Sequence, residues 1–351
     1  MSTHPFLAGL RQSPDYFLNN FDLVNRRGLV IQTSEADYRR ASFLDERMFT
    51  PATRGAWFPL DTLLAETADV GVHKPLHLIF HVSHCGSTLI SRLLAELPGC
   101  FPLREPLTLV ALGVEQRELA RPTSRLDMAA WERLFNLSMA LWSRTYRPED
   151  RTMLKATSVA GNLAEDMLAR SLDTRALHIY TDIEPWLTVM LRGPQVRENG
   201  KAFAPSWLMD LHALTGRTDV RLAALGDAEQ CAINWLMSML CYLRCQAQCP
   251  GRVKQLNFEE FLQQPHIKLE ELARFFGLDS RKIDELVAGP LMRSYAKRPG
   301  EPFDASKRKQ EMQETRKRHG DEIRAGLKFA ERLCREIPLL EPLGAYLGKG
   351  A

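Results

Sequence analysis

One stretch constrains the fold more than any other: an apolar run of strand length, a turn that contains glycine, and a helical pattern. The run covers residues 76–82, the turn reads His81-Val82-Ser83-His84-Cys85-Gly86-Ser87-Thr88, and helical spacing continues to Pro98-Gly99. A strand that enters a helix in this way points backbone N–H groups at an anion, and the helix dipole adds partial positive charge. The segment predicts a phosphate-binding turn. The alternative is a strand–turn–helix connection that binds no ligand.

Strands and helices alternate along the chain after this turn. Strands are predicted over residues 100–103, 152–156, 176–181 and 252–258, and helical patterns lie between them over 124–146, 162–171 and 227–248. Alternation of this kind is typical of a parallel sheet with helices on both faces. We therefore expect an α/β fold of the P-loop kind: a three-layer arrangement with a central parallel sheet of about five strands.

Composition shifts suggest how the chain is organised around this sheet. Residues 1–70, with a predicted strand over 28–33, are expected to form an N-terminal lead-in that packs on the main domain, which covers residues 71–310. Residues 193–225 are richer in Gly, Pro and Arg, and we interpret them as an insertion that can act as a lid over the site. Residues 311–351 are expected to form a C-terminal helical extension, and a charged helix is predicted over residues 305–336.

The turn differs from the usual ATP and GTP loop. That loop reads G-x-x-x-x-G-K-[ST], with a lysine directly after its second glycine. In this chain His81 stands at the position of the first glycine, and Ser87 follows Gly86 where the lysine belongs. A conventional Mg-dependent ATPase is therefore disfavoured.

Several motifs in a fixed order resemble the sulfotransferase family, and bacterial sulfotransferase-like proteins in particular. His84-Cys85-Gly86-Ser87-Thr88-Leu89 is similar to the R-S-G-T-T-L sulfate-donor loop. The stretch Leu103-Arg104-Glu105-Pro106 follows the second strand, where many members carry a functional acid, and Leu154-Lys155-Ala156-Thr157 ends the third. Residues 257–265 resemble Y-E-D-L-x-x-x-P, and residues 273–278 resemble F-L-G-L. The resemblance covers roughly residues 76–310.

Membership of this family would imply a five-stranded parallel sheet, 3′-phosphoadenylyl sulfate as sulfuryl donor, and no metal. The acceptor would be a hydroxyl or amine of a small molecule or carbohydrate. The resemblance and the phosphate-binding pattern together nominate a set of donor-binding residues: His84, Cys85, Gly86, Ser87, Thr88, Leu89, Ser158, Lys297 and Arg298.

Two positions depart from the family pattern. The loop cation, Lys or Arg in most members, is His84 in this chain. The fourth strand usually ends in R-D-P, with a serine eight residues after the arginine, and both grip the 3′-phosphate. This chain has Thr181 in place of the arginine, with Thr188 and Val189 around the position of the serine.

Sulfuryl transfer requires an aligned acceptor, a base, and stabilisation of charge on the leaving oxygen. Glu105 is the candidate base, with Arg104 next to it to orient the carboxylate; the alternative is a structural ion pair between the two. Lys155 is the candidate electrophile, because it interrupts an apolar strand on the phosphate side; the alternative is a lysine that snorkels at a strand end. His84 completes the catalytic set as a partly charged donor.

The remaining candidates have weaker patterns. Ser158 can donate to the same phosphate or cap the following helix. Lys297 and Arg298 belong to a basic stretch that resembles a late loop of the family and can supply the charge lost at Thr181; the alternative is a solvated surface loop. His81 can reach the acceptor pocket, although a buried core histidine is the more frequent outcome.

Charge and cysteine content limit the partners. The chain has 46 basic and 43 acidic residues, a net charge of +3, so no concentrated basic field for nucleic acid is expected. No signal peptide and no membrane span are predicted, and 7 irregularly spaced cysteines suit a reducing, cytoplasmic location. The sequence assigns neither the acceptor nor the oligomeric state.

Two other function classes stay open. One is a P-loop protein that binds another nucleotide or transfers phosphate, which the departures at His84 and Thr181 favour. The other is a catalytically degenerate fold kept as a binding protein, in which Glu105 and Lys155 would have no activity to support.

Overall fold

The centre of the protein is a parallel sheet. The structure, a computed structural model, describes residues 4–71, 74–294 and 305–347. Its five-stranded sheet has the order β5-β6-β4-β7-β8, and every neighbouring pair is parallel. The strands are β4 (His77–His81), β5 (Cys100–Arg104), β6 (Arg151–Lys155), β7 (Arg175–Tyr180) and β8 (Val253–Asn257). Each overlaps a predicted strand, so the α/β fold class is confirmed.

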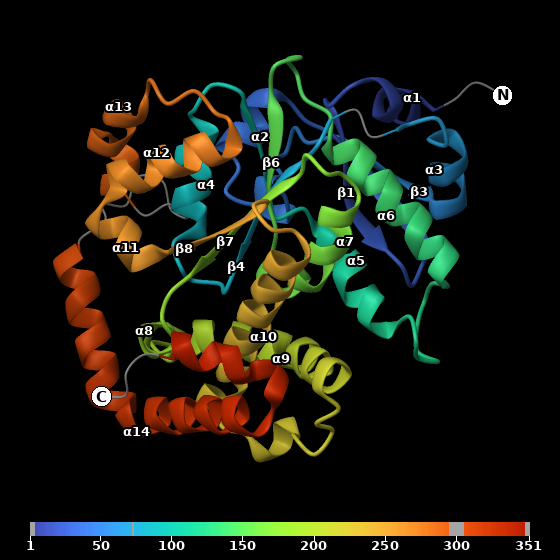
Figure 1. Cartoon of the computed structure of the whole chain (residues 1–351). Helices are drawn as coiled ribbons and strands as arrows, with labels where there is room; N and C mark the ends of the chain where they lie inside the picture. The colour runs from blue at the N-terminus through green and yellow to red at the C-terminus, as the bar shows by residue number, and fades with distance from the viewer. Residues whose placement is uncertain (1–3, 72–73, 295–304, 348–351) are drawn as a thin grey trace.

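Helices cover both faces of this sheet, because alternate strand residues point to opposite sides. Leu78 and Phe80 of β4 join one apolar core, whereas Ile79 joins the other. Figure 1 shows α4 and α12 on one side of the strands and α5, α6 and α7 on the other. The bounds are α4 (Ser87–Ala95), α5 (Leu107–Glu118), α6 (Met128–Trp142), η2 (Ser158–Leu163), α7 (Ala164–Ala169), α11 (Phe258–Gln263), α12 (Pro265–Phe276), α13 (Ile283–Ala288) and η4 (Pro290–Arg293).

The strand order fixes where a ligand is expected. The chain leaves β4 toward the β5 edge of the sheet, but it leaves β7 toward β8 at the opposite edge. Adjacent strands whose connections diverge form a crevice at their carboxyl ends, and ligands of open α/β sheets bind there. The turn after β4 lies at this point.

Residues 4–71 form a small antiparallel layer. Three strands have the order β1-β2-β3, and the predicted strand over 28–33 is β2. Its partners were not expected from the sequence. The elements are α1 (Pro5–Gln12), β1 (Tyr16–Asp22), β2 (Arg27–Gln32), α2 (Glu35–Arg40), η1 (Glu46–Met48), β3 (Gly55–Pro59) and α3 (Leu60–Glu66). Leu18 and Val30 share a core with Phe101 of β5, so the layer packs on the main sheet.

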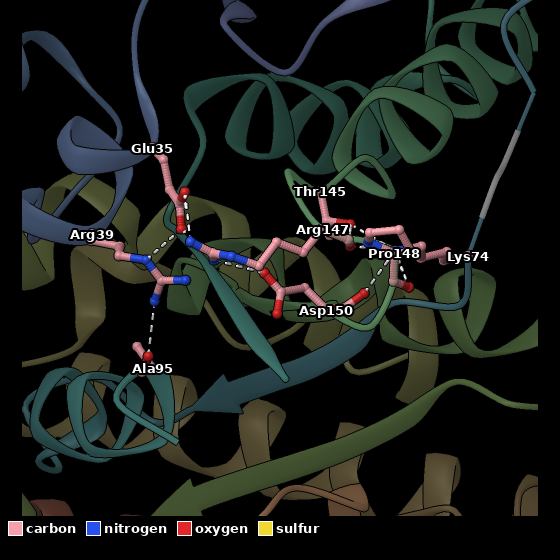
Figure 2. A network of polar contacts seen from close by, with 8 residues as sticks. All are labelled: Glu35, Arg39, Lys74, Ala95, Thr145, Arg147, Pro148 and Asp150. Atoms are coloured by element: carbon pink, nitrogen blue, oxygen red, sulfur yellow. Dashed lines mark hydrogen bonds and ion pairs between the residues drawn. The ribbon is translucent and has the colours of Figure 1, made fainter. Parts of the chain in front are cut away.

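Polar contacts tie this layer to the amino ends of the strands (Figure 2). Arg39 of α2 donates to Glu35 at 2.9 Å and to the Ala95 carbonyl at 3.1 Å, and Arg147 also binds Glu35, at 2.8 Å. Lys74 donates to four oxygens of one loop, the Thr145 hydroxyl and the carbonyls of 147, 148 and 150, at 2.7–3.0 Å. Backbone carbonyls that bind a lysine fix the loop, so this cluster has a structural role.

Long helices lie on the side of the carboxyl ends (Figure 1). Residues 193–225, predicted as an insertion, are mostly helix α9, which packs on α8, α10 and η2. The predicted boundary at residue 311 falls inside α14. The bounds are α8 (Ile183–Met190), α9 (Pro194–Thr215), η3 (Leu222–Ala224), α10 (Asp227–Gln248), α14 (Ala305–Glu336) and η5 (Pro338–Tyr346). Within the described ranges, no helix combines the length and apolar character needed to cross a membrane.

Candidate functional site

The turn after β4 has an unusual backbone. Ser83, His84 and Gly86 have φ angles of 64°, 45° and 74°, and Glu105, directly after β5, has 54°. In the described part of the chain only four residues other than glycine have positive φ, and three of them lie at these two strand ends. Each such residue costs on the order of 1–2 kcal/mol and persists only where the surroundings impose it. The strain therefore gathers at the predicted site.

Neighbouring elements hold this turn in place. Trp186 of α8 donates its indole N–H to the Ser83 carbonyl at 3.0 Å, and the buried Cys85 thiol donates to the Ile179 carbonyl of β7 at 3.3 Å. A Cβ on Gly86 would overlap the ring of Phe258, the first residue of α11. Glycine is thus required by its φ and by this ring. The Cys85 side chain packs inward, so it offers no exposed thiolate.

The first turn of α4 can accept an anion. Its first N–H groups have no partner inside the helix, as at every helix N-terminus. Ser87 and Thr88 are both buried, and Thr88 Oγ1 has no hydrogen-bond partner within the described residues. A buried hydroxyl without a partner costs about 1–3 kcal/mol, so a ligand oxygen at this position would be stabilising. His84 is half-buried in the turn, and Leu89 packs against the core.

Lys155 and Glu105 lie in direct contact beside this turn. The Lys155 ammonium, at the end of β6, donates to Glu105 Oε1, and the Glu105 N–H donates to the Lys155 carbonyl at 2.7 Å. The Lys155 side chain is only 1% exposed and that of Glu105 is 15% exposed. Parallel strands bring their carboxyl ends to one edge, which is why two residues 50 positions apart meet. The snorkelling alternative for Lys155 is therefore wrong.

Arg104 does not orient Glu105, contrary to the sequence-based expectation, and the two do not form the alternative ion pair. Successive strand residues point to opposite faces. The buried Arg104 guanidinium turns away and donates to the Ser91 hydroxyl at 3.2 Å and to the carbonyls of residues 38, 39 and 41 at 2.8–3.3 Å. These carbonyls belong to the C-terminal part of α2 and the residue after it. Burial lowers the Arg104 pKa to about 10, and the residue attaches the N-terminal layer to β5.

Two residues near Glu105, Phe43 and Arg47, were not selected from the sequence. The Arg47 guanidinium stacks over the Phe43 ring at 3.6 Å, and the same ring lies 5.9 Å from Lys155 Nζ. The side-chain hydrogen bond to Asp45 raises the pKa of Arg47, and the Glu105 charge adds to this effect. His81, weighed earlier as a core residue, is buried with Nε2 3.9 Å from Glu105 Oε1. Phe43 and Arg47 lie 50 or more residues from Lys155, so only the fold brings them together.

Of the other predicted donor-binding residues, the structure describes Ser158 but not Lys297 and Arg298. Ser158 is the first residue of η2, half-buried, and the helix start has no side-chain cap, so the capping alternative is not realised. Lys297 and Arg298 lie outside the described residues. In the described part of the chain, no group of three or more His, Cys, Asp or Glu side chains is arranged to hold a metal ion.

The carboxyl ends of β7 and β8 carry acidic residues. Burial raises the pKa of Asp182, and Asn257 donates to this carboxylate at 2.9 Å. Glu184 binds Arg316 of α14 in a bidentate pair at 2.7 and 2.9 Å. Glu259 binds Arg308 of the same helix at 2.5 Å. The Thr188 hydroxyl donates to the Glu184 carbonyl at 2.9 Å. Figure 1 shows the first part of α14 alongside α8 and α11.

Comparisons with known proteins return solved structures only, because no family model and no curated protein matches the chain. A sulfotransferase from Alicyclobacillus acidocaldarius is 14% identical, over 75% of this chain and 96% of its own, with a TM-score of 0.36. The sulfotransferase domain of the curacin biosynthetic pathway is 13% identical, over 70% and 97%, with 0.39. A retinol dehydratase in complex with androsterone and inactive cofactor PAP is 13% identical, over 89% and 96%, with 0.34.

The first two of these structures belong to the family that the sequence motifs resemble. All three TM-scores lie below 0.4.

Proposed function

We propose that this protein is a sulfotransferase that moves a sulfuryl group from 3′-phosphoadenylyl sulfate to a hydroxyl or amine of a small-molecule or carbohydrate acceptor. One observation carries the proposal: a buried lysine and a glutamate are in contact at two adjacent strand ends, beside the turn after β4. A carboxylate and an ammonium in this position are the base and the electrophile that sulfuryl transfer needs.

The donor's 5′-phosphate would occupy the N-terminus of α4. Backbone N–H groups of the turn bind its oxygens, and the Ser87 and Thr88 hydroxyls supply further donors, including the unpartnered Thr88 Oγ1. His84, Cys85, Gly86 and Leu89 contribute backbone, and the His84 ring adds a donor near the sulfate. Ser158, at the start of η2, is a further donor to the same phosphate.

Transfer then requires Lys155 and Glu105 to separate. The Lys155 ammonium donates to the oxygen that joins sulfur to phosphorus and stabilises the charge that develops there. Glu105 takes the proton of the acceptor hydroxyl or amine while a bond forms from that atom to sulfur and the bond from sulfur to the bridging oxygen breaks. The products are a sulfated acceptor and 3′-phosphoadenosine 5′-phosphate, and the proton passes from Glu105 to solvent.

The donor class is tested first by ligand binding. A thermal-shift panel compares 3′-phosphoadenosine 5′-phosphate with ATP, GTP and AMP, and a ligand at 100 times its Kd adds about 2.7 kcal/mol to the free energy of unfolding. We expect a clear rise in Tm with the first compound and a smaller one with AMP. Equal shifts with ATP and GTP would contradict the proposal.

The reaction is tested next with radiolabelled 3′-phosphoadenylyl sulfate and a panel of phenols, amines and sugars. Glu105→Gln should lower transfer about 100-fold or more and leave donor affinity within a few-fold, because a base acts on the acceptor proton. Glu271→Gln, which removes a carboxylate that pairs with Lys254 at 3.2 Å, is the matched control and should keep most of the activity. Equal rates for the two variants would rule out Glu105 as the base.

A second candidate, a protein that binds a different nucleotide, is favoured by the acidic residues at β7 and β8. Asp182, Glu184 and Glu259 oppose a second phosphate at this location. The panel separates the two functions, since a nucleotide without a 3′-phosphate would then bind best. If no nucleotide raised the Tm, the function that remains would be that of a catalytically degenerate binding protein.

A further inference from the structure

The two ring nitrogens of His81, the last residue of β4, face different groups. Nδ1 accepts the backbone N–H of Ser83 at 3.0 Å, and Nε2 lies 3.9 Å from Glu105 Oε1. The side chain is 6% exposed, so water has little access to the ring. The residue thus lies between the turn that would hold the donor and the carboxylate that would act on the acceptor.

The hydrogen bond to Ser83 determines the tautomer of the ring. A ring nitrogen that accepts a hydrogen bond carries no proton, so the proton of a neutral imidazole must be on the other nitrogen. In His81 this places an N–H on Nε2, on the side of Glu105. A carboxylate oxygen is the natural acceptor for such a donor.

The distance to Glu105 explains why the bond is not formed in this structure. At 3.9 Å the two atoms are outside hydrogen-bond range, and the same carboxylate oxygen is held by Lys155. If Lys155 turns to the donor, Glu105 loses its ammonium partner. A small rotation of the carboxylate then brings it to the His81 N–H.

The turn itself is fixed on the other side of His81. Trp186 donates to the Ser83 carbonyl at 3.0 Å, and Ser83 has a φ of 64°. The N–H of this same residue meets the His81 ring. A continuous set of contacts therefore runs from α8 through the turn and His81 to Glu105.

We infer that His81 is a positioning residue through which the donor-binding turn controls the catalytic carboxylate: Glu105 exchanges its Lys155 partner for the His81 Nε2–H when the donor binds. This inference rests on the proposed sulfuryl transfer and adds a residue to it. The His81 N–H stabilises the ionised form of Glu105 during the step in which Lys155 is occupied, and so keeps it able to accept a proton.

Two substitutions separate the two hydrogen bonds of the ring. Asparagine places its amide near Nδ1, so His81→Asn keeps a partner for the Ser83 N–H and loses the donor to Glu105. Glutamine reaches the position of Nε2, so His81→Gln keeps that donor and loses the partner of Ser83. Because both variants are polar and smaller than histidine, they control for each other's effect on packing.

We expect His81→Asn to lower kcat about 10- to 100-fold with donor affinity within three-fold of the wild type, since a hydrogen bond to a charged group is lost. Its kcat should fall at a higher pH on the acid side than that of the wild type. The charged groups around Glu105 are Lys155 from β6 and Arg47 from η1, and both stay in place. His81→Gln should keep the wild-type pH profile and bind the donor more weakly.

The tautomer gives a readout that does not depend on activity. In ¹⁵N-labelled protein, the histidine signal that disappears in His81→Asn should have a protonated Nε2 and an unprotonated Nδ1. The inference alone would be overturned if an active enzyme carried the His81 proton on Nδ1. It would also be overturned if both variants lost kcat equally and kept the wild-type pH profile. A wild type with the expected tautomer but no sulfuryl transfer would overturn the proposed function and, with it, the role of His81.

Discussion

The carboxyl edge of the sheet has two halves with different charges. At β4, β5 and β6 one lysine and one glutamate form a single buried contact beside the anion-binding turn. At β7 and β8 three carboxylates gather, and two of them are neutralised by arginines of α14 with side chains 27–39% exposed. The first half is prepared for one anion without any rearrangement of the backbone. The second can accept another phosphate only if its arginines change partners.

This difference changes the interpretation of Thr181, which stands where the sulfotransferase pattern has an arginine. Positive charge is present near the ends of β7 and β8, but it comes from Arg308 and Arg316, more than 120 residues further along the chain. Both arginines are held by glutamates of the helices that follow these strands. The 3′-phosphate would therefore compete with Glu184 and Glu259 for the same guanidinium groups.

The largest effect is expected at Lys155. Lys155→Met should lower transfer about 100- to 1000-fold, as the loss of one donor to a developing charge does in other active sites. It also leaves the Glu105 carboxylate without its ammonium, which costs up to about 3 kcal/mol of stability. Transfer assays and thermal unfolding measure the two effects separately.

Two controls make this prediction specific to the first half of the edge. Lys254→Met changes a β8 lysine that binds Glu271 at 3.2 Å, and should leave transfer unchanged. The double variant Lys155→Met/Glu105→Gln should recover stability but no activity. If transfer activity fell in proportion to the free energy of unfolding in all three variants, Lys155 would be only a structural partner of Glu105.

The next effect concerns the contact between the halves, where Phe258 packs on Gly86. Gly86→Ala forces an alanine into a φ of 74° and against the ring, so we expect a loss of about 2–4 kcal/mol and at least ten-fold weaker donor binding. Unfolding experiments and a binding titration provide the measurements.

Gly216→Ala is the matched control, because Gly216 has a φ of 71° but open space around its Cβ position. It should lose about 1–2 kcal/mol and no affinity. Gly86→Ala/Phe258→Leu should regain part of the binding. If Gly86→Ala and Gly216→Ala behaved alike, the Phe258 ring would have no part in shaping the turn.

The fold could be predicted from the sequence to a large extent, because long-range order in a parallel sheet follows from local patterns. Each of the five strands was predicted from a short segment of strand length, and the edge on which Glu105 and Lys155 meet follows from their positions just after one such strand and at the end of another. Residues 28–33 were expected as a strand for the same reason. Strands β1 and β3 alternate less clearly, and they were missed.

The details of the site could not be predicted, since they depend on backbone conformation and on distant segments. The direction of Arg104 depends on the carbonyls that α2 offers, and that helix comes from another part of the chain. The turn after β4 has positive φ angles at Ser83 and His84, which no residue type at these positions reveals, and it brings the Ser83 N–H to His81. Arg316 reaches Glu184 only because α14 lies alongside α8.

A smaller effect is expected when the charge of the second half is changed. Glu184→Gln frees Arg316 for a phosphate, whereas Arg316→Gln leaves Glu184 unneutralised. We expect affinity for 3′-phosphoadenosine 5′-phosphate to rise about five-fold in the first variant and to fall about five-fold in the second, the scale of a partly exposed ion pair. Calorimetric titration of AMP, which lacks the 3′-phosphate, should give nearly constant affinity. Parallel changes for both ligands would place the 3′-phosphate elsewhere.

The smallest effect is the pH dependence of Asp182. Burial raises its pKa, and the charges of Glu260 and Glu259 add to the shift, so the folded protein disfavours the ionised form. As pH falls through this raised pKa, Asp182 becomes neutral, the fold gains stability from this group, and the second half loses one negative charge. Affinity for 3′-phosphoadenosine 5′-phosphate relative to AMP should rise about two- to three-fold as the pH falls from 7 through this raised pKa.

Asp182→Asn should remove most of this rise while keeping the hydrogen bond from Asn257, because an asparagine oxygen can still accept it. The phosphates of the ligands titrate identically in both proteins, so any difference between the two pH profiles belongs to residue 182. Identical profiles would mean that the ligand does not sense the acidic half of the edge. The anion would then interact with the turn after β4 alone, and a donor with a single phosphate group would fit the site better than one with two.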